Sequence, residues 1–221
     1  PRTLAEMEPV IEKIAAWEFG QSRDPLYDFS EFLQGVLASP AALREVEGRL
    51  LRVLQSNATL PGKDFVCRQL SVIGTAASVP VLSGMLLRPE TSDMARYALD
   101  GIPGNASANA LLAALPKASG KVKIGIINSL GHRRDAKSVP ALKALVSSRE
   151  SGIWEAAAGA LAAIGDGPAL EALAAARGER SGAERLRVSE AYLRCAEKVA
   201  AGSGKTAALK AYRQLVAATE P

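Results

Sequence analysis

The segment Gly202-Ser-Gly-Lys-Thr206 contains the residues that end a phosphate-binding P-loop. In a complete P-loop another glycine stands five residues before Gly204, and here that position is Val199. The motif also needs a preceding strand, so that backbone amides can cradle the phosphate, whereas residues 194–201 have a helical pattern. We therefore predict a turn between two helices here, with Lys205 and Thr206 opening the second helix.

The residues that could serve as nucleophiles or metal ligands are few and scattered. His132 is the only histidine, and the two cysteines, Cys67 and Cys195, lie far apart inside helical patterns. A metal site needs several ligands with suitable spacing, and a nucleophile needs a base nearby. The sequence therefore predicts no catalytic residue, no metal site and no cofactor, and it favours a protein that is not an enzyme.

A basic segment is the strongest candidate for binding. Residues 117–150 hold eight Lys and Arg against two Asp and Glu, in a chain whose net charge is +4. Arg133 and Arg134 precede a helix expected near Ser138, whose amides and dipole should add to the attraction for an anion. Two interpretations stay open: a merely solvated surface, which is the more frequent case for a charged segment, and a contact for an anionic group or an acidic protein surface. The basic residues concerned are Lys121, Lys123, Arg133, Arg134, Lys137 and Lys143.

Two aromatic residues, Tyr97 and Trp154, lie in the helical repeats described below and could be partly exposed along a groove. Exposed aromatic side chains are frequent hot spots of protein interfaces. The predicted partner-binding residues are therefore Arg133, Arg134, Lys137, Lys143, Trp154 and Tyr97. Nucleic acid is a less favoured ligand, because the basic segment has no interleaved aromatic residues.

The elements that must position these residues repeat along the chain. Each repeat has a helical stretch, a Gly or Pro stop, a short polar link and a second helix. The stops at Gly74, Pro103, Gly131 and Gly165 are 29, 28 and 34 residues apart, a period typical of solenoids. The low aromatic content of 5% also favours close helix packing over a sheet. We predict an all-α protein, a right-handed α-solenoid (superhelix) of stacked antiparallel helix pairs.

The division of the chain follows from the regularity of the repeats. We expect one solenoid over residues 1–221, with irregular N-terminal helices at 1–63, regular repeats at 64–180 and a C-terminal helical cap at 181–221. Asp64, and one of Thr91, Ser92 or Asp93, are expected to cap first helices. The stop glycines are expected to adopt positive φ at helix C-termini. Leu70, Leu99, Ile127 and Leu161 should be buried at equivalent sites.

Two stretches, Ile164-Gly-Asp-Gly-Pro-Ala-Leu-Glu-Ala-Leu173 and Arg134-Asp-Ala-Lys-Ser-Val-Pro-Ala-Leu-Lys-Ala-Leu145, resemble HEAT repeats of the bacterial, phycobilisome-lyase-like type. Longer stretches such as Gly125-Ile-Ile-Asn-Ser-Leu-Gly131 resemble a bacterial subgroup whose members are often exported. The resemblance implies an armadillo-like superhelix that acts as a protein-binding scaffold through its concave groove. The partner would be a protein of unknown identity.

Two other functions remain open at this point. The resemblance also allows a lyase or lyase subunit that handles an anionic tetrapyrrole, and the basic repeat allows nucleic-acid binding. The resemblance implies a periplasmic or exported location. A cytoplasmic location stays possible, because residues 1–20 carry four Glu and do not form a signal peptide. No run of about 18 apolar residues predicts a membrane span.

Overall fold

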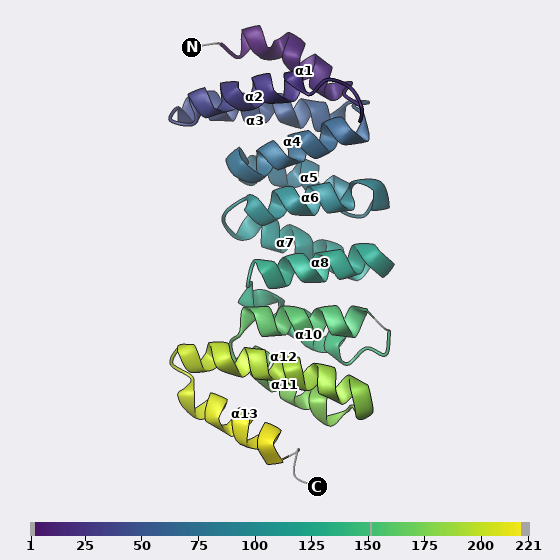
Figure 1. Ribbon diagram of the computed structural model, residues 1–221, viewed down its shortest axis with the longest axis vertical. Coiled ribbons are helices and arrows are strands. Elements are labelled where there is room, and N and C mark those ends of the chain that lie inside the picture. Colours follow the sequence, from purple (N-terminus) through teal and green to yellow (C-terminus); the bar gives the residue numbers. More distant parts are fainter. Residues whose placement is uncertain (1–2, 151, 218–221) are drawn as a thin grey trace. The chain divides into compact units, whose positions relative to one another are not determined.

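The computed structural model describes residues 3–150 and 152–217, and all regular elements in these ranges are helical. Figure 1 shows them as a succession of short helices. The chain divides into two compact units, one ending at Ala110 and the other starting at Leu111, so the boundary falls within α7 (Asn105–Ala114). The all-α class is as predicted, and the chain is an α-solenoid. The division into caps and repeats stays a prediction.

The first unit, up to Ala110, contains the N-terminal helices of the chain. Its elements before α7 are η1 (Ala5–Met7), α1 (Glu8–Ala15), α2 (Asp24–Val36), α3 (Pro40–Gln55), α4 (Leu60–Ile73), η2 (Ala76–Ser78), α5 (Val79–Met85) and α6 (Pro89–Gly101). Helix α4 packs along α6, and α3 packs against α4 and α5. The unit therefore consists of antiparallel pairs whose first helices lie side by side.

The second unit, from Leu111 on, contains the remaining helices. Its elements after α7 are η3 (Leu115–Lys117), α8 (Gly120–His132), η4 (Ala136–Ser138), α9 (Val139–Val146), α10 (Ile153–Ile164), α11 (Gly167–Gly178), α12 (Gly182–Ala201) and α13 (Lys205–Ala217). Helix α10 packs between α8 and α12, while α9 and α11 form a second layer (Figure 1). Helix α13 packs along α12.

The core of each unit lies between its two layers. Leu70 and Leu99 in the first unit, and Ile127 and Leu161 in the second, have no exposed surface. Each lies in the second half of a first helix, and their burial is as predicted. Burial of such apolar side chains is the main term that holds one pair against the next.

Several expected helix ends are wrong. Helix α4 begins at Leu60 rather than at Asp64, because the hydroxyl of Thr59 accepts from the Gly62 N–H at 3.1 Å. Helix α6 begins at Pro89, so Thr91 and Ser92 lie inside its first turn. In both cases a proline lies in the first turn of the helix. Proline is favoured there because the first N–H groups of a helix have no acceptor within the helix, so its missing N–H costs no hydrogen bond.

The predicted role of the stop glycines holds for Gly165 only. Gly165 ends α10 with φ +68°, the left-handed conformation of a helix C-cap. Gly131 instead continues α8 and faces α10, where a Cβ would lie 2.7 Å from the Cα of Ala160. Its small size is needed for the close approach of two first helices, not for a turn.

Candidate binding surface

The basic segment folds into a tight turn between α8 and α9. The Arg133 N–H donates to the Ser129 carbonyl at 2.9 Å, and the Arg134 N–H donates to Gly131 at 3.1 Å. Arg134 then has φ +52°, the only positive φ of a non-glycine residue in the described chain. This conformation is uncommon for a side chain larger than glycine. It reverses the backbone and starts η4 within a few residues.

Three cationic side chains of this segment are exposed. Arg134 and Lys137 lie on the turn, and Lys143 lies on α9, four residues beyond its start. Within residues 3–150 and 152–217 no carboxylate pairs with any of the three. We call Arg134, Lys137 and Lys143 the basic turn. Arg133 is half-buried and lies behind this surface.

The expected contribution of the helix amides is wrong. The carboxylate of Asp135 accepts from the Lys137 N–H at 3.2 Å, and the carbonyl of Asp135 accepts from the Ser138 hydroxyl at 2.6 Å. Pro140, in the first turn of α9, has no N–H to offer. Asp135 thus caps η4, which leads directly into α9, so the side chains of the basic turn are the groups left to attract an anion.

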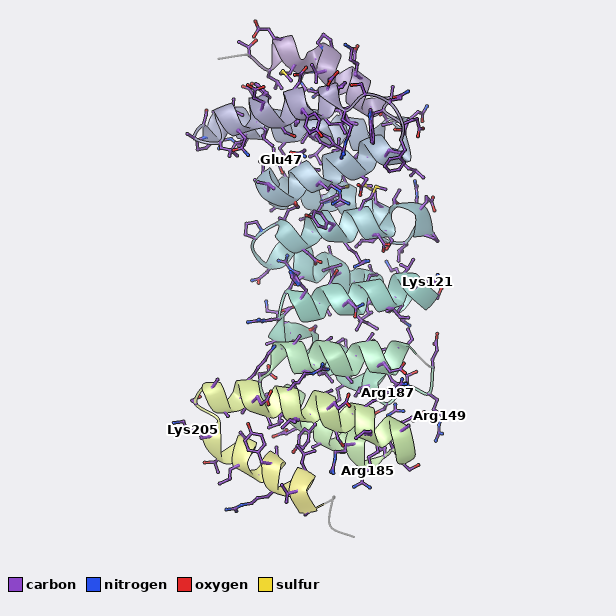
Figure 2. All side chains as sticks on the ribbon, in the orientation of Figure 1. Glu47, Lys121, Arg149, Arg185, Arg187 and Lys205 are labelled. Carbon is purple, nitrogen blue, oxygen red and sulfur yellow. The ribbon has the colours of Figure 1, made fainter. Side chains whose placement is uncertain are left out.

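The structure does not bring the whole basic segment together. Lys121 lies at the start of α8, eleven residues before His132, which corresponds to about 16 Å along the helix. Figure 2 shows Lys121 at that end of α8. Lys121 and Lys123 therefore belong to the opposite edge of the second unit, away from the basic turn.

Trp154 is buried, so its expected exposure along a groove is wrong. Only 3% of its surface is accessible, and the guanidinium of Arg180 covers its ring at 4.1 Å. The same guanidinium donates to the carbonyls of Val146 and Ser148 at 2.7 and 2.8 Å and pairs with Glu184. Trp154 and Arg180 together fix the loop between α9 and α10, which explains why an aromatic residue opens α10.

Tyr97 is exposed, but it belongs to the first unit. Half of its surface is accessible, and the Arg68 guanidinium lies 5.1 Å from its ring centroid. Arg68 also pairs with Asp64 at 2.8 Å, and this hydrogen-bonded carboxylate raises the pKa of Arg68. The aromatic face of Tyr97 is therefore already used on one side by a cation of its own unit.

The residues that could carry catalysis are buried or dispersed. Burial raises the pKa of both cysteine thiols, Cys67 and Cys195, to about 12. A thiol with such a pKa is protonated at neutral pH and is a poor nucleophile. No three His, Cys, Asp or Glu side chains within the described ranges lie close enough together to hold a metal ion.

The segment Gly202-Ser-Gly-Lys-Thr206 forms the predicted turn. Helix α12 runs to Ala201 and α13 begins at Lys205, so a helix stands where a P-loop requires a strand.

Among the described helices, none has the length and hydropathy of a membrane-spanning segment.

One buried charge was missed from the sequence. Glu47 on α3 is 3% exposed, and its carboxylate accepts hydrogen bonds from the Thr75 N–H at 2.7 Å and the Ser78 hydroxyl at 2.5 Å. The Thr75 hydroxyl adds contacts of 3.0 Å to both oxygens. Figure 2 shows Glu47 where α3 meets the turn after α4. The signal was present, because Glu47 interrupts the apolar stripe of α3 between Leu43 and Leu50.

Comparison with known proteins gives a family match over part of the chain. Residues 108–194, which include the basic turn, match the family described as HEAT repeats. No curated protein matches the chain. The match supports the predicted repeat type, while the phycobilisome-lyase-like subgroup and export remain predictions.

Two solved structures resemble the chain at low similarity. An engineered protein from the Northeast Structural Genomics Consortium aligns over 95% of this chain with 19% identity and a TM-score of 0.49, and the chain spans 61% of its length. A designed armadillo repeat protein in complex with the peptide (KR)4 aligns over 94% of this chain and 99% of its own, with 14% identity and a TM-score of 0.45.

Proposed function

We propose that this chain is a non-catalytic protein-interaction scaffold, and that the basic turn is one of its contact points for an acidic segment of a protein partner. The observation that carries the proposal is the exposure of Arg134, Lys137 and Lys143 without carboxylate partners. The HEAT/armadillo type of fold is typical of interaction scaffolds. Arg134 offers a planar fork for a carboxylate, and the two lysines add point charges.

A protein partner fits this surface better than a nucleic acid. Nucleic-acid sites combine a broad basic face with aromatic side chains that stack on bases. The turn itself, residues 133–138, contains no aromatic residue, and Trp154 on the next first helix is buried. Its three free cations match a short run of Asp or Glu rather than an extended phosphate backbone.

The second helices of the repeats would line the concave face of the scaffold. Lys143 on α9 belongs to this layer, and the turn residues lie at the start of the same helix. An acidic segment would therefore enter the groove over α9, with Arg134 and Lys137 at its edge. Tyr97 would serve as a separate contact on the first unit. We propose an exported location on the resemblance alone.

The test compares the wild type with two variants of equal charge change in a pull-down from lysate and envelope fractions of the native bacterium. The variant Arg134→Glu/Lys137→Glu alters the basic turn, and Lys205→Glu/Lys210→Glu alters two exposed cations of α13. We expect a partner that binds the wild type and the α13 variant and is lost from the turn variant. The fraction in which the partner appears also tests the location.

Two further measurements separate the alternatives. A fluorescein-labelled poly-glutamate peptide and a labelled DNA duplex of matched charge are titrated against the wild type at several salt concentrations. Preference for the peptide supports the proposal. A partner that both variants retain, or tighter binding of DNA with a steep salt dependence, would reject the basic turn as a protein contact.

A further inference from the structure

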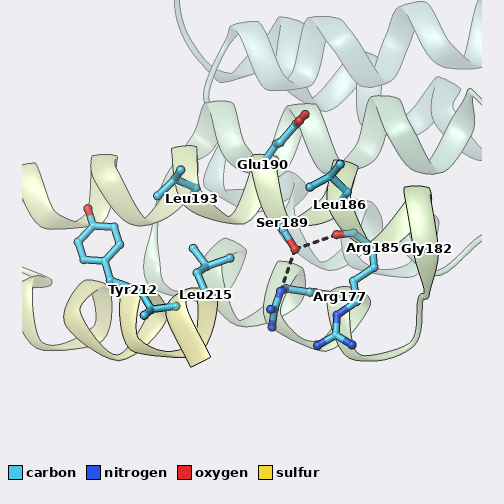
Figure 3. Close-up of a pocket in the computed structure, with 10 residues that line it drawn as sticks. Arg177, Gly182, Arg185, Leu186, Ser189, Glu190, Leu193, Tyr212 and Leu215 are labelled. Carbon is cyan, nitrogen blue, oxygen red and sulfur yellow. Dashed lines mark hydrogen bonds between the residues drawn. The ribbon is translucent and has the colours of Figure 1, made fainter. Parts of the chain in front are cut away.

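The second unit leaves an apolar groove open between α12 and α13. The groove has a volume of about 590 Å³ and is bordered by Leu186 and Leu193 of α12 and by Leu215 of α13. Leu186 is 63% exposed and Leu193 is 40% exposed. Figure 3 shows these leucines along the groove, with Tyr212 closing one end. A hollow of this size can hold two or more side chains of a ligand.

The open face of α12 is the one on which a further helix of the stack would pack. Cys195 and Lys198 face α10, since they contact the carbonyls of Leu161 and Ala163. Leu193 is two residues from Cys195, which places it about 200° around the helix. Because α8, α10 and α12 already pack one on another, the groove offers a helix-sized place on the far side of α12.

One end of the groove is basic. Arg177 and Arg185 extend side by side there, and the carboxylate of Glu190 points away from them (Figure 3). The Arg177 Nε donates to the Ser189 hydroxyl at 2.9 Å, which fixes this guanidinium at the groove wall. Within the described ranges neither guanidinium is paired with a carboxylate. The pair therefore presents free N–H groups beside an apolar stripe.

We propose that this groove binds an amphipathic helix of another protein, which places two leucine-sized side chains against Leu186 and Leu193 and a carboxylate on Arg177 and Arg185. The seven-residue spacing of the two leucines matches two helical turns, so the partner needs apolar residues at the same spacing. Its Asp or Glu must lie at the end of that apolar stripe. This site is separate from the basic turn and does not depend on the function proposed above.

The charge at the rim favours an amphipathic helix that carries an acid over a purely apolar or a basic helix. An apolar helix without an acid would leave both guanidinium groups at the rim without a carboxylate, while a basic helix would be repelled by them. A carboxylate beside Arg185 can accept two parallel hydrogen bonds from one guanidinium. The groove thus selects for acid at one end, which a purely apolar docking face would not do.

The experiment uses the whole chain and a phage-displayed library of helical peptides of about 15 residues, randomised on one face. We expect selection on the wild type to enrich apolar pairs seven residues apart with Asp or Glu at one end. The best peptide is then labelled with fluorescein, and its affinity is measured by fluorescence anisotropy. Arg185→Glu should weaken binding about tenfold or more, the usual scale for losing a charge-assisted hydrogen bond.

The matched control is Arg194→Glu, which makes the same charge change on an exposed residue of α12 that does not border the groove. It should leave the affinity unchanged. A peptide with Lys in place of its acid should bind Arg185→Glu better than it binds the wild type. Leu193→Glu should abolish binding of both peptides, and circular dichroism verifies that each variant is folded.

Three results would overturn the proposal. One is a selection that enriches no acid, or enriches basic residues. Another is an affinity that Arg185→Glu and Arg194→Glu change equally. The third is concentration-dependent self-association of the wild type that Leu193→Glu removes, since the groove would then belong to a second copy of the chain.

Discussion

Replacing Gly131 by Ala should reveal how closely α8 and α10 approach each other. An added Cβ would lie 2.7 Å from the Cα and 2.8 Å from the Cβ of Ala160, about 0.6–0.7 Å short of the ordinary contact of 3.4 Å. Both neighbours belong to the helix backbone or its first side-chain atom, so neither can rotate away. The two helices must separate, and overpacking of this kind costs about 1–3 kcal/mol.

The matched control is Gly159→Ala in the middle of α10, where an added Cβ meets no atom within 4 Å. Ala is preferred over Gly in a helix by about 1 kcal/mol, so this variant should be more stable than the wild type. The variant Gly131→Ala gains less from this helix preference, because position 131 lies in the last turn of α8. We expect the free energies of unfolding of the two variants to differ by about 2 kcal/mol.

Urea unfolding followed by circular dichroism measures this difference. The double variant Gly131→Ala/Ala160→Gly should show a favourable coupling of at least about 0.5 kcal/mol, because the second change removes one of the two clashing atoms. If both glycine variants shift stability by the same amount in the same direction, the close approach of α8 and α10 is refuted.

Two further predictions concern buried groups. Burial raises the pKa of Cys195 from 9.0 to about 12. As the pH rises, the thiol therefore loses its proton in the unfolded chain before it does so in the folded chain. The stability linked to the protonated thiol falls between pH 9 and 12. The unfolding free energy of the wild type minus that of Cys195→Ala should therefore fall by about 1.4 kcal/mol per pH unit above pH 9, and a constant difference would contradict it. Glu47→Ala should cost about 3–5 kcal/mol in urea unfolding, because it leaves the Thr75 N–H and the Ser78 hydroxyl unsatisfied. The exposed Glu45→Ala should stay within about 0.5 kcal/mol, and an equal effect of both would count against the buried network.

The repeat pattern predicted the elements better than their ends. Periodic apolar residues identified each helix pair because burial of Leu70, Leu99, Ile127 and Leu161 dominates packing. The start of a helix was harder to predict, because several nearby residues can each act as its N-cap. Thr59 precedes Asp64, and Pro61 lies between them, so the earlier cap determines where α4 begins.

The candidate site was predicted in part, for a physical reason. Charge can be counted along the sequence, and this located the basic turn. The length of α8 determines which charges lie at the same end of the helix. Lys121 lies at its start and Arg134 follows its end, so the two are far apart. Exposure of an aromatic residue depends on its neighbours, and Arg180, 26 residues farther along the chain, buries Trp154. The groove beside Leu193 escaped notice because its walls come from two helices.

Both proposed surfaces lie in the unit that starts at Leu111, where 17 Lys and Arg stand against 10 Asp and Glu. Some cations of each unit pair with carboxylates, as Arg49 does with Glu8 at 2.6 Å and Arg187 with Glu155 at 2.8 Å. Within the described ranges no carboxylate pairs with Arg134 or Arg185, so both can meet an external carboxylate. The two surfaces are not one site. Figure 2 places Arg185 toward the edge of this unit where Lys121 begins α8, and the basic turn lies at the other end of that helix. A short acidic ligand can therefore occupy only one of them, and a partner that uses both must present two acidic segments.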